Sequence, residues 1–193
     1  MAVGQRDGDV DCCPAGHRGV EVQMKRSKGS LATVLIAGVL LLAGCGEEVK
    51  PNAQEITGNT FCALDGMLLL DYPGPKAQIH YDQGSPEFFC DTVEMFSIYT
   101  RPEQEKRILA VYVQDMGKAD WTKPLGHWIN AETAFYVGFS RRNGSMGPTL
   151  ASFAREEDAR EFIKQYGGEL FRFDQVTPEM TTLDGGVLND EGM

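Results

Sequence analysis

The chain has few basic residues. Only 18 Lys and Arg stand against 28 Asp and Glu, which gives a formal net charge of −10. A protein that binds the phosphate backbone of a nucleic acid needs a basic surface, so nucleic acid is excluded as an expected partner. The acidic balance instead favours solubility, or attraction to a cationic partner.

Cysteine is also sparse, and the motifs of common enzymes are missing. The chain has five cysteines, of which Cys62 and Cys90 lie beyond residue 45. This number excludes a disulfide-dense scaffold. The sequence contains no Cys-x-x-Cys, no phosphate-binding loop, no Gly-x-Ser-x-Gly and no His-Glu-x-x-His. Nucleotide chemistry and the common hydrolases therefore lack support.

One apolar run has the form of a lipoprotein signal. Residues 31–43 are too few for a membrane-spanning helix, which needs about 20 residues. A positively charged segment precedes this run, and small residues end it at Leu42-Ala43-Gly44-Cys45, the pattern of a lipobox. The sequence therefore predicts a signal peptide over residues 24–44, a lipid on Cys45, and a periplasmic protein anchored to a membrane.

The remaining segments divide around one folded domain. Residues 1–23 resemble no signal segment, and we interpret them as a non-essential extension or a misassigned start; a long, genuine start of the signal is the alternative. Residues 45–60 are expected to form a lipidated tether, 61–176 the folded domain and 177–193 a flexible acidic tail. Gly46 stands where inner-membrane lipoproteins carry aspartate, which favours the outer membrane.

Hydrophobic periodicity predicts an α+β fold with two similar ββαβ halves, over about 61–114 and 127–176. The expected strands are 67–70, 77–81, 108–113, 133–139, 149–153 and 170–173. One helix is expected to begin at Asp91, with Glu94 completing a capping box. The other begins at Glu156 and ends before Gly167.

Sulfur-bearing side chains are the best candidates for a functional site. Cys62 and Met67 bracket Gly66, which lets the backbone fold back and can bring a thiol and a thioether onto one ion. Soft ligands of this kind select Cu(I), which tolerates two or three ligands. Met146 lies on a predicted glycine-rich turn, where packing gives little reason for a methionine. That these methionines simply fill the core stays open as the alternative.

Four further residues are weaker candidates for the same site. Cys90 could form a disulfide with Cys62, remain a buried thiol or add a ligand, and the spacing alone does not choose among these. Met116 follows a predicted strand. His80 and His127 lie near strand ends, where a hydrogen-bonded structural role is the more common one.

Four segments of the chain carry a resemblance to a known family: Cys62–Met67, Tyr72–Ile79, Phe89–Phe96 and Ser145–Leu150. In these segments the chain resembles the NosL family, the lipoprotein accessory factors of nitrous oxide reductase. The resemblance implies two similar ββαβ halves and a periplasmic protein that binds Cu(I). It also implies delivery of copper to the copper-sulfur centre of nitrous oxide reductase, together with the NosDFY ABC-type complex of the membrane.

The resemblance also implies a ligand set. The family's cysteine and methionine ligands correspond to Cys62, Met67 and Met146 of this chain. Many members have Cys-x-x-Cys-Gly-Met, whereas this chain has Asp65 in place of the second cysteine. The segment therefore offers one thiolate where those members offer two.

The predicted function is a lipid-anchored copper chaperone that is not an enzyme. Three alternatives stay open. One is a thiol oxidoreductase that uses Cys62 and Cys90, and another is a lyase that cleaves a metal–carbon bond, with Asp65 as the nearest acid. The third is an interaction module that binds no metal.

Overall fold

The computed structural model describes residues 50–101, 103 and 106–182. The predicted signal peptide, the lipobox and Cys45 lie outside the described residues. Among the described residues, none of the helices has the length and apolar character that crossing a membrane requires.

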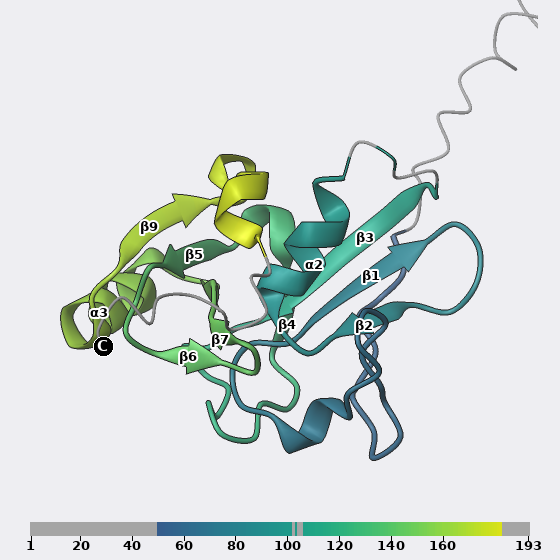
Figure 1. Cartoon of the computed structure of the whole chain (residues 1–193), viewed down its shortest axis with the longest axis horizontal. Coiled ribbons are helices and arrows are strands. Elements are labelled where there is room, and N and C mark those ends of the chain that lie inside the picture. Colours follow the sequence, from purple (N-terminus) through teal and green to yellow (C-terminus); the bar gives the residue numbers. More distant parts are fainter. Residues whose placement is uncertain (1–49, 102, 104–105, 183–193) are drawn as a thin grey trace, which may run out of the picture. The chain divides into compact units, whose positions relative to one another are not determined.

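The first half of the domain is a ββαβ unit. Its elements are β1 (Ala77–Tyr81), β2 (Glu87–Phe89), α2 (Thr92–Tyr99) and β3 (Ile108–Gln114). The strands are antiparallel in the order β2-β1-β3, and β4 (Trp128–Asn130) extends this sheet beyond β3 (Figure 1).

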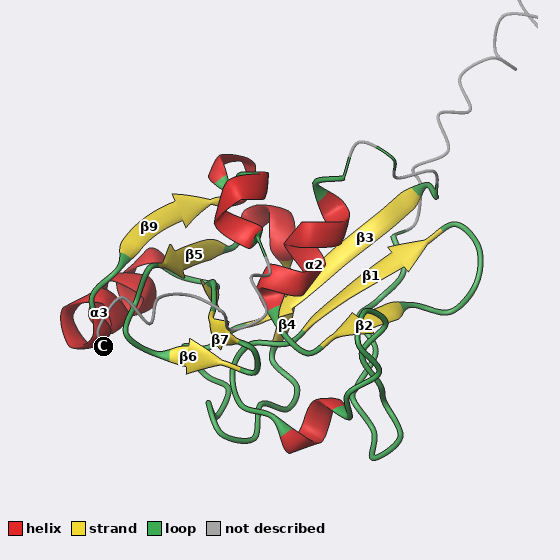
Figure 2. Cartoon of the chain, in the orientation of Figure 1, coloured by secondary structure: helices red, strands yellow, loops and turns green. Residues whose placement is uncertain are grey.

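The second half repeats this arrangement. Its elements are β5 (Phe135–Gly138), β8 (Ala151–Phe153), α3 (Glu156–Tyr166) and β9 (Glu169–Arg172). The sheet order β8-β5-β9 again places the first strand of the unit in the centre. Helices and antiparallel sheets thus form two similar ββαβ halves (Figure 2), which confirms the predicted α+β fold.

The halves differ in the connection between their first two strands. In the first half, residues 82–86 join β1 to β2 directly. In the second half, the connection contains a small hairpin of β6 (Asn143–Gly144) and β7 (Gly147–Pro148), with Ser145 and Met146 at its tip. The predicted glycine-rich turn is therefore a hairpin that reaches away from its own sheet.

The two helices are buried to different degrees. The first five residues of α2 are all buried, and Phe96 lies in a core cluster with Tyr136 of the second half. Two residues of α3, Ala159 and Phe162, are buried, and its other faces are polar or charged. The helix α2 is therefore the internal one, packed by side chains of both halves.

One predicted strand is wrong. Residues 67–70 form no strand: they contain an isolated bridge from Leu68 to Phe61 and the start of the 3-10 helix η1 (Leu69–Asp71). The preceding turn closes on itself, since the Cys62 N–H donates to the Met67 carbonyl at 2.8 Å. These local bonds take the place of a strand ladder.

Parts of the predicted tether and tail are packed rather than free. Ile56 is buried, and the backbone of Gln54 exchanges two hydrogen bonds with the side chain of Gln78. At the other end, the 3-10 helix η4 (Pro178–Thr181) buries Thr181 and packs Met180 against the core. The remaining 3-10 helices are η2 (Ala131–Thr133) and η3 (Phe173–Gln175).

Candidate metal centre

Cys62 lies in a tight turn held against β2. The Gly66 N–H donates to the Cys62 carbonyl at 3.0 Å, and Gly66 has a φ of +76°, a conformation that favours glycine. The Ala63 N–H donates to the Phe88 carbonyl at 2.7 Å. These bonds fix the thiol of Cys62, which is only 4% exposed, at the edge of the first sheet.

Cys90 lies where β2 ends and α2 begins. Asp91 caps the helix, as predicted, by accepting the Val93 N–H at 3.0 Å. The predicted capping box is wrong, however, because the Glu94 carboxylate accepts the N–H of Cys90 at 3.1 Å rather than that of Asp91. Glu94 thus points back along the helix toward the two thiols.

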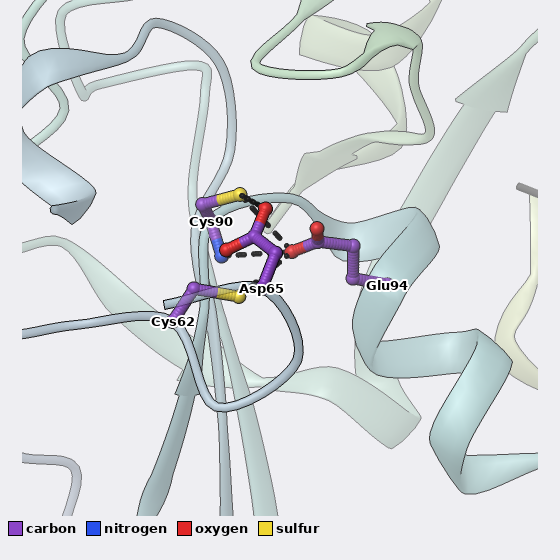
Figure 3. Close-up of side chains that lie close together, drawn as sticks. All are labelled: Cys62, Asp65, Cys90 and Glu94. Carbon is purple, nitrogen blue, oxygen red and sulfur yellow. Dashed lines mark hydrogen bonds between the residues drawn. The ribbon is translucent and has the colours of Figure 1, made fainter. Parts of the chain in front are cut away.

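The two thiols share one carboxylate oxygen. Oε2 of Glu94 accepts hydrogen bonds from the Cys62 Sγ at 3.2 Å and from the Cys90 Sγ at 3.1 Å. Asp65 approaches from the turn, with its Oδ2 3.7 Å from the Cys90 Sγ. One potential ligand atom from each of these four residues lies within 4.8 Å of the others (Figure 3).

Both cysteines are free thiols in the structure. Of the three possibilities left open for Cys90, the structure therefore has the buried thiol, placed beside Cys62 so that it can also serve as a ligand. Two adjacent sulfurs suit a soft monovalent ion such as Cu(I), whereas the carboxylate oxygens alone would suit harder cations.

The environment separates the pKa values of the acidic groups. Hydrogen bonds from the Cys90 thiol and from backbone N–H groups outweigh burial and lower the pKa of Cys62 to about 6. The same thiol contact, together with burial, raises the pKa of Cys90. Burial raises the pKa of Glu94 to about 8. Cys62 is therefore the first of the two to become a thiolate, the form that binds metal.

A buried lysine lies next to this cluster. The Nζ of Lys76 donates to the carbonyls of Cys90 at 2.8 Å and Pro73 at 2.9 Å, and the residue is fully buried. Burial lowers the pKa of Lys76, while the nearby acids, Asp91 first among them, raise it. Its ammonium group offsets negative charge that the thiols and carboxylates bring into the interior.

The β6–β7 hairpin brings Met146 to the same region. The hydroxyl of Ser145 donates to the Cys90 carbonyl at 2.6 Å, and its N–H donates to the Asp91 Oδ2 at 3.2 Å. Met146 is the next residue and is 48% exposed. Met67 lies half-buried in the turn of Cys62. The structure thus gathers the segments that carry both thiols and both methionines.

The other three candidates are held elsewhere. His80 bonds Gln78 at 2.8 Å, and its ring meets the edge of the Tyr112 ring. Met116 packs against the buried side chains of Val137 and Phe153 in the core of the second half. His127 is exposed and accepts the Asp115 N–H through its carbonyl.

Glu94 is a member of the site that the sequence did not predict. Asp91 and Glu94 match the spacing of a capping box, so that motif explained the glutamate fully. The available signal was the capping box itself, because a glutamate at the third helical position folds its side chain back over the start of the helix, and Cys90 directly precedes the capping residue.

The chain is similar to known proteins over most of its length. The NosL family model matches residues 53–181. The copper-binding lipoprotein NosL of Stutzerimonas stutzeri is 39% identical over 171 residues, covering 84% of this chain and 88% of the relative. The protein of the same name from Achromobacter cycloclastes is 39% identical over 159 residues, covering 78% and 82%.

A solved structure shares the fold. The crystal structure of the copper chaperone NosL from Shewanella denitrificans has a TM-score of 0.63 and 39% sequence identity. The match covers 66% of this chain and 97% of that one.

Proposed function

The chain belongs to the NosL family, and from this premise we propose that it is a copper chaperone whose cargo is Cu(I), carried at the thiol pair of Cys62 and Cys90. The observation that carries the proposal is the sharing of one buried carboxylate oxygen by the two thiols. Two sulfurs so close together suit a soft ion.

Each residue of the site has a distinct role in binding the ion. Cys62 supplies the thiolate and Cys90 a second sulfur, while Met67 and Met146 supply neutral thioethers. Metal binding displaces thiol protons, and Glu94 is the acceptor for the proton of Cys62, because its Oε2 contacts that thiol and its pKa of about 8 exceeds the value of about 6 for Cys62. One carboxylate takes one proton, so the proton of Cys90 leaves to solvent. A thioether needs no deprotonation, and it exchanges readily with the ligands of an acceptor protein.

The place of this chaperone in the cell follows from the signal segment and the family. We propose that a lipid on Cys45 anchors it on the periplasmic side of a membrane, with the outer membrane preferred. Two relatives are named copper-binding lipoproteins. The acceptor is nitrous oxide reductase, whose copper-sulfur centre is assembled with the NosDFY complex, and the chaperone acts without catalytic turnover.

A thiol oxidoreductase is the second candidate, because two free thiols lie together and one has a lowered pKa. It differs from the chaperone in requiring a disulfide that forms and is reduced repeatedly. Exposing the protein to a thiol–disulfide couple, then unfolding it and alkylating its free thiols, distinguishes the oxidoreductase from the chaperone. In a chaperone, both thiols remain reduced and are alkylated.

An anaerobic titration with Cu(I) against a chromophoric chelator tests the proposal. The reduced protein should bind about one equivalent, and Cys62→Ser should lower its affinity by orders of magnitude while the circular dichroism spectrum stays unchanged. Absence of binding by the reduced parent would refute a copper chaperone. An unchanged affinity in Cys62→Ser would refute the site.

Delivery is measured separately. Cu(I)-loaded protein is mixed with copper-free nitrous oxide reductase in membranes that contain NosDFY, and copper in the re-isolated enzyme is quantified. Transfer that exceeds that from Cu(I)–chelator alone supports the proposed acceptor, and equal transfer contradicts it.

A further inference from the structure

The β6–β7 hairpin is held in place at its base as well as at its tip. The indole N–H of Trp121 donates to the Asn143 carbonyl at 3.1 Å, and the guanidinium of Arg142 lies 4.3 Å from the centre of the same indole ring. The carbonyl of Trp121 in turn accepts the Gly74 N–H at 2.8 Å. The base of the hairpin is thus linked to the turn that precedes β1.

Close glycine packing leaves the hairpin little freedom to shift. A Cβ atom on Gly74 would lie 2.6 Å from the Cα of Gly144. A Cβ atom on Gly144 would overlap the carboxylate of Asp91 and lie 2.9 Å from the Cβ of Thr149. The backbone of Gly144 therefore packs directly against the backbone of Gly74 and the carboxylate of Asp91. The absence of side chains at both glycines makes these contacts possible.

Asp91 uses its two carboxylate oxygens for different purposes. Oδ1 accepts the Val93 N–H and, at 2.7 Å, the Thr149 hydroxyl, so this oxygen caps α2. Oδ2 accepts the N–H of Ser145 at 3.2 Å and lies 3.4 Å from its hydroxyl oxygen, whose proton is donated mainly to the Cys90 carbonyl. Helix capping requires only one acceptor. The second oxygen of this fully buried residue binds the tip of the hairpin instead.

We propose that Asp91 is a positioning residue, which holds the hairpin tip beside Cys90 and thereby sets the position of Met146 at the cargo site. The inference rests on the proposed function, in which Met146 is a ligand. A methionine side chain has three rotatable bonds and loses their freedom when it binds. When the backbone of Ser145 is already fixed, less conformational entropy is lost as the Met146 thioether binds the ion.

The variant Asp91→Asn separates the two oxygens. With the amide oxygen at the capping position, the NH₂ group faces the Ser145 N–H, so a donor meets a donor while the helix cap remains. Gly144→Ala is a second variant that displaces the hairpin by a different route, should Asp91→Asn fail to fold. Asp82→Asn, at an exposed loop of the first half, is the matched control for the change in charge.

A double-mutant cycle with Met146→Leu tests the inference. Cu(I) affinities of the full-length parent, both single variants and the double variant are measured by chelator competition, and X-ray absorption counts the sulfur ligands. We expect each single variant to weaken binding by about tenfold and to lose one sulfur ligand, and the double variant to be no weaker than Met146→Leu. Asp82→Asn should match the parent.

The outcomes distinguish this inference from the proposed function. Additive losses in the double variant, or a full sulfur count in Asp91→Asn, would overturn the role of Asp91 while leaving copper binding intact. A loss in Asp91→Asn beside an unchanged Met146→Leu would also overturn it, because the effect would not pass through the methionine. Absence of Cu(I) binding by the parent would refute the chaperone proposal itself.

Discussion

The two ββαβ halves share an order of elements but differ where the second strand meets the helix. In the first half this junction reads Phe89-Cys90-Asp91, and in the second it reads Phe153-Ala154-Arg155. Both phenylalanines pair with the central strand of their sheet. In the first half the next two residues carry a thiol (Cys90) and a capping carboxylate (Asp91). In the second half they carry a methyl group (Ala154) and an exposed guanidinium (Arg155).

The difference extends into the helices. The first turn of α2 is buried and turns Glu94 toward the thiols, whereas the first turn of α3 carries Asp158 in an exposed pair with Arg155. The second half contributes its hairpin instead. Under the proposed function, similar topology therefore supports a division of labour, in which one half carries both thiols and Met67 and the other carries Met146.

The largest expected effect comes from exchanging the junction residues. Cys90→Ser removes one of the two thiols and should weaken Cu(I) binding by about 10⁴-fold, or roughly 5.5 kcal/mol. Ala154→Cys places a thiol at the corresponding position of the second half but gives it no partner thiol, so we expect no second copper equivalent. Chelator competition measures both. A second equivalent in Ala154→Cys would contradict the comparison.

The next effect concerns the pH dependence of stability in the reduced, metal-free protein. The pKa of Glu94 in the folded state, about 8, exceeds its usual value of 4.5, so the folded state binds the proton more tightly. This contribution to stability is complete below pH 4.5 and is lost as the pH rises through about 8, with an upper limit of about 5 kcal/mol. Urea unfolding of Glu94→Gln should lack this decline.

Asp158→Asn is the counterpart in the second half and should act with the opposite sign. Hydrogen bonds from Arg155 lower the pKa of Asp158, so its contribution is present above its usual pKa and is lost as the pH falls. Unfolding curves from pH 3 to 9 test both variants. If Glu94→Gln followed the same curve as the parent, the buried state of Glu94 would be contradicted.

Removal of the helix caps should have an intermediate effect. Asp91→Ala removes the Val93 cap and acceptors for Thr149 and Ser145, and we expect a loss of about 2 kcal/mol. Arg155 occupies the N-cap of α3 without a capping bond from its side chain. Arg155→Ala should therefore cost far less than Asp91→Ala in urea unfolding. Equal losses would remove the contrast between the helices.

The smallest effect is expected on the outer face of α3. Arg160 pairs with Glu156 one turn earlier, and the side chains are 63% and 41% exposed. Arg160→Ala should change the unfolding free energy by less than about 0.5 kcal/mol, and by less still in high salt. Its Cu(I) affinity should equal that of the parent. A tenfold weaker affinity would place this outer face in the cargo site.

Local patterns predicted the elements whose signals lie within one segment. The strand at 77–81 has the bounds expected from its composition. The helix α3 begins at Glu156, and the left-handed Gly167 ends it, because its apolar spacing and its stop signal are both local. The strand expected at 67–70 failed because the turn at Cys62 satisfies its own backbone groups.

The assembly of the candidate site could be predicted only in part. Cys62, Met67 and Met146 were chosen for their sulfur chemistry, and nothing in their spacing shows that Cys90 meets Cys62. That meeting depends on the bridge between Cys62 and Phe88, a pairing between distant segments whose register no local pattern specifies. Glu94 was hidden by a capping motif with the same spacing.

The attachment of the hairpin also has a consequence for the order of folding. The sequence separation between Cys62 and Glu94 is 32 residues, whereas that between Asp91 and Ser145 is 54. Closing the longer loop costs more chain entropy, and contacts between distant residues form slowly. We therefore expect the first half to assemble its thiol pair before the hairpin docks, so that a newly made chain presents both thiols to copper before it presents Met146.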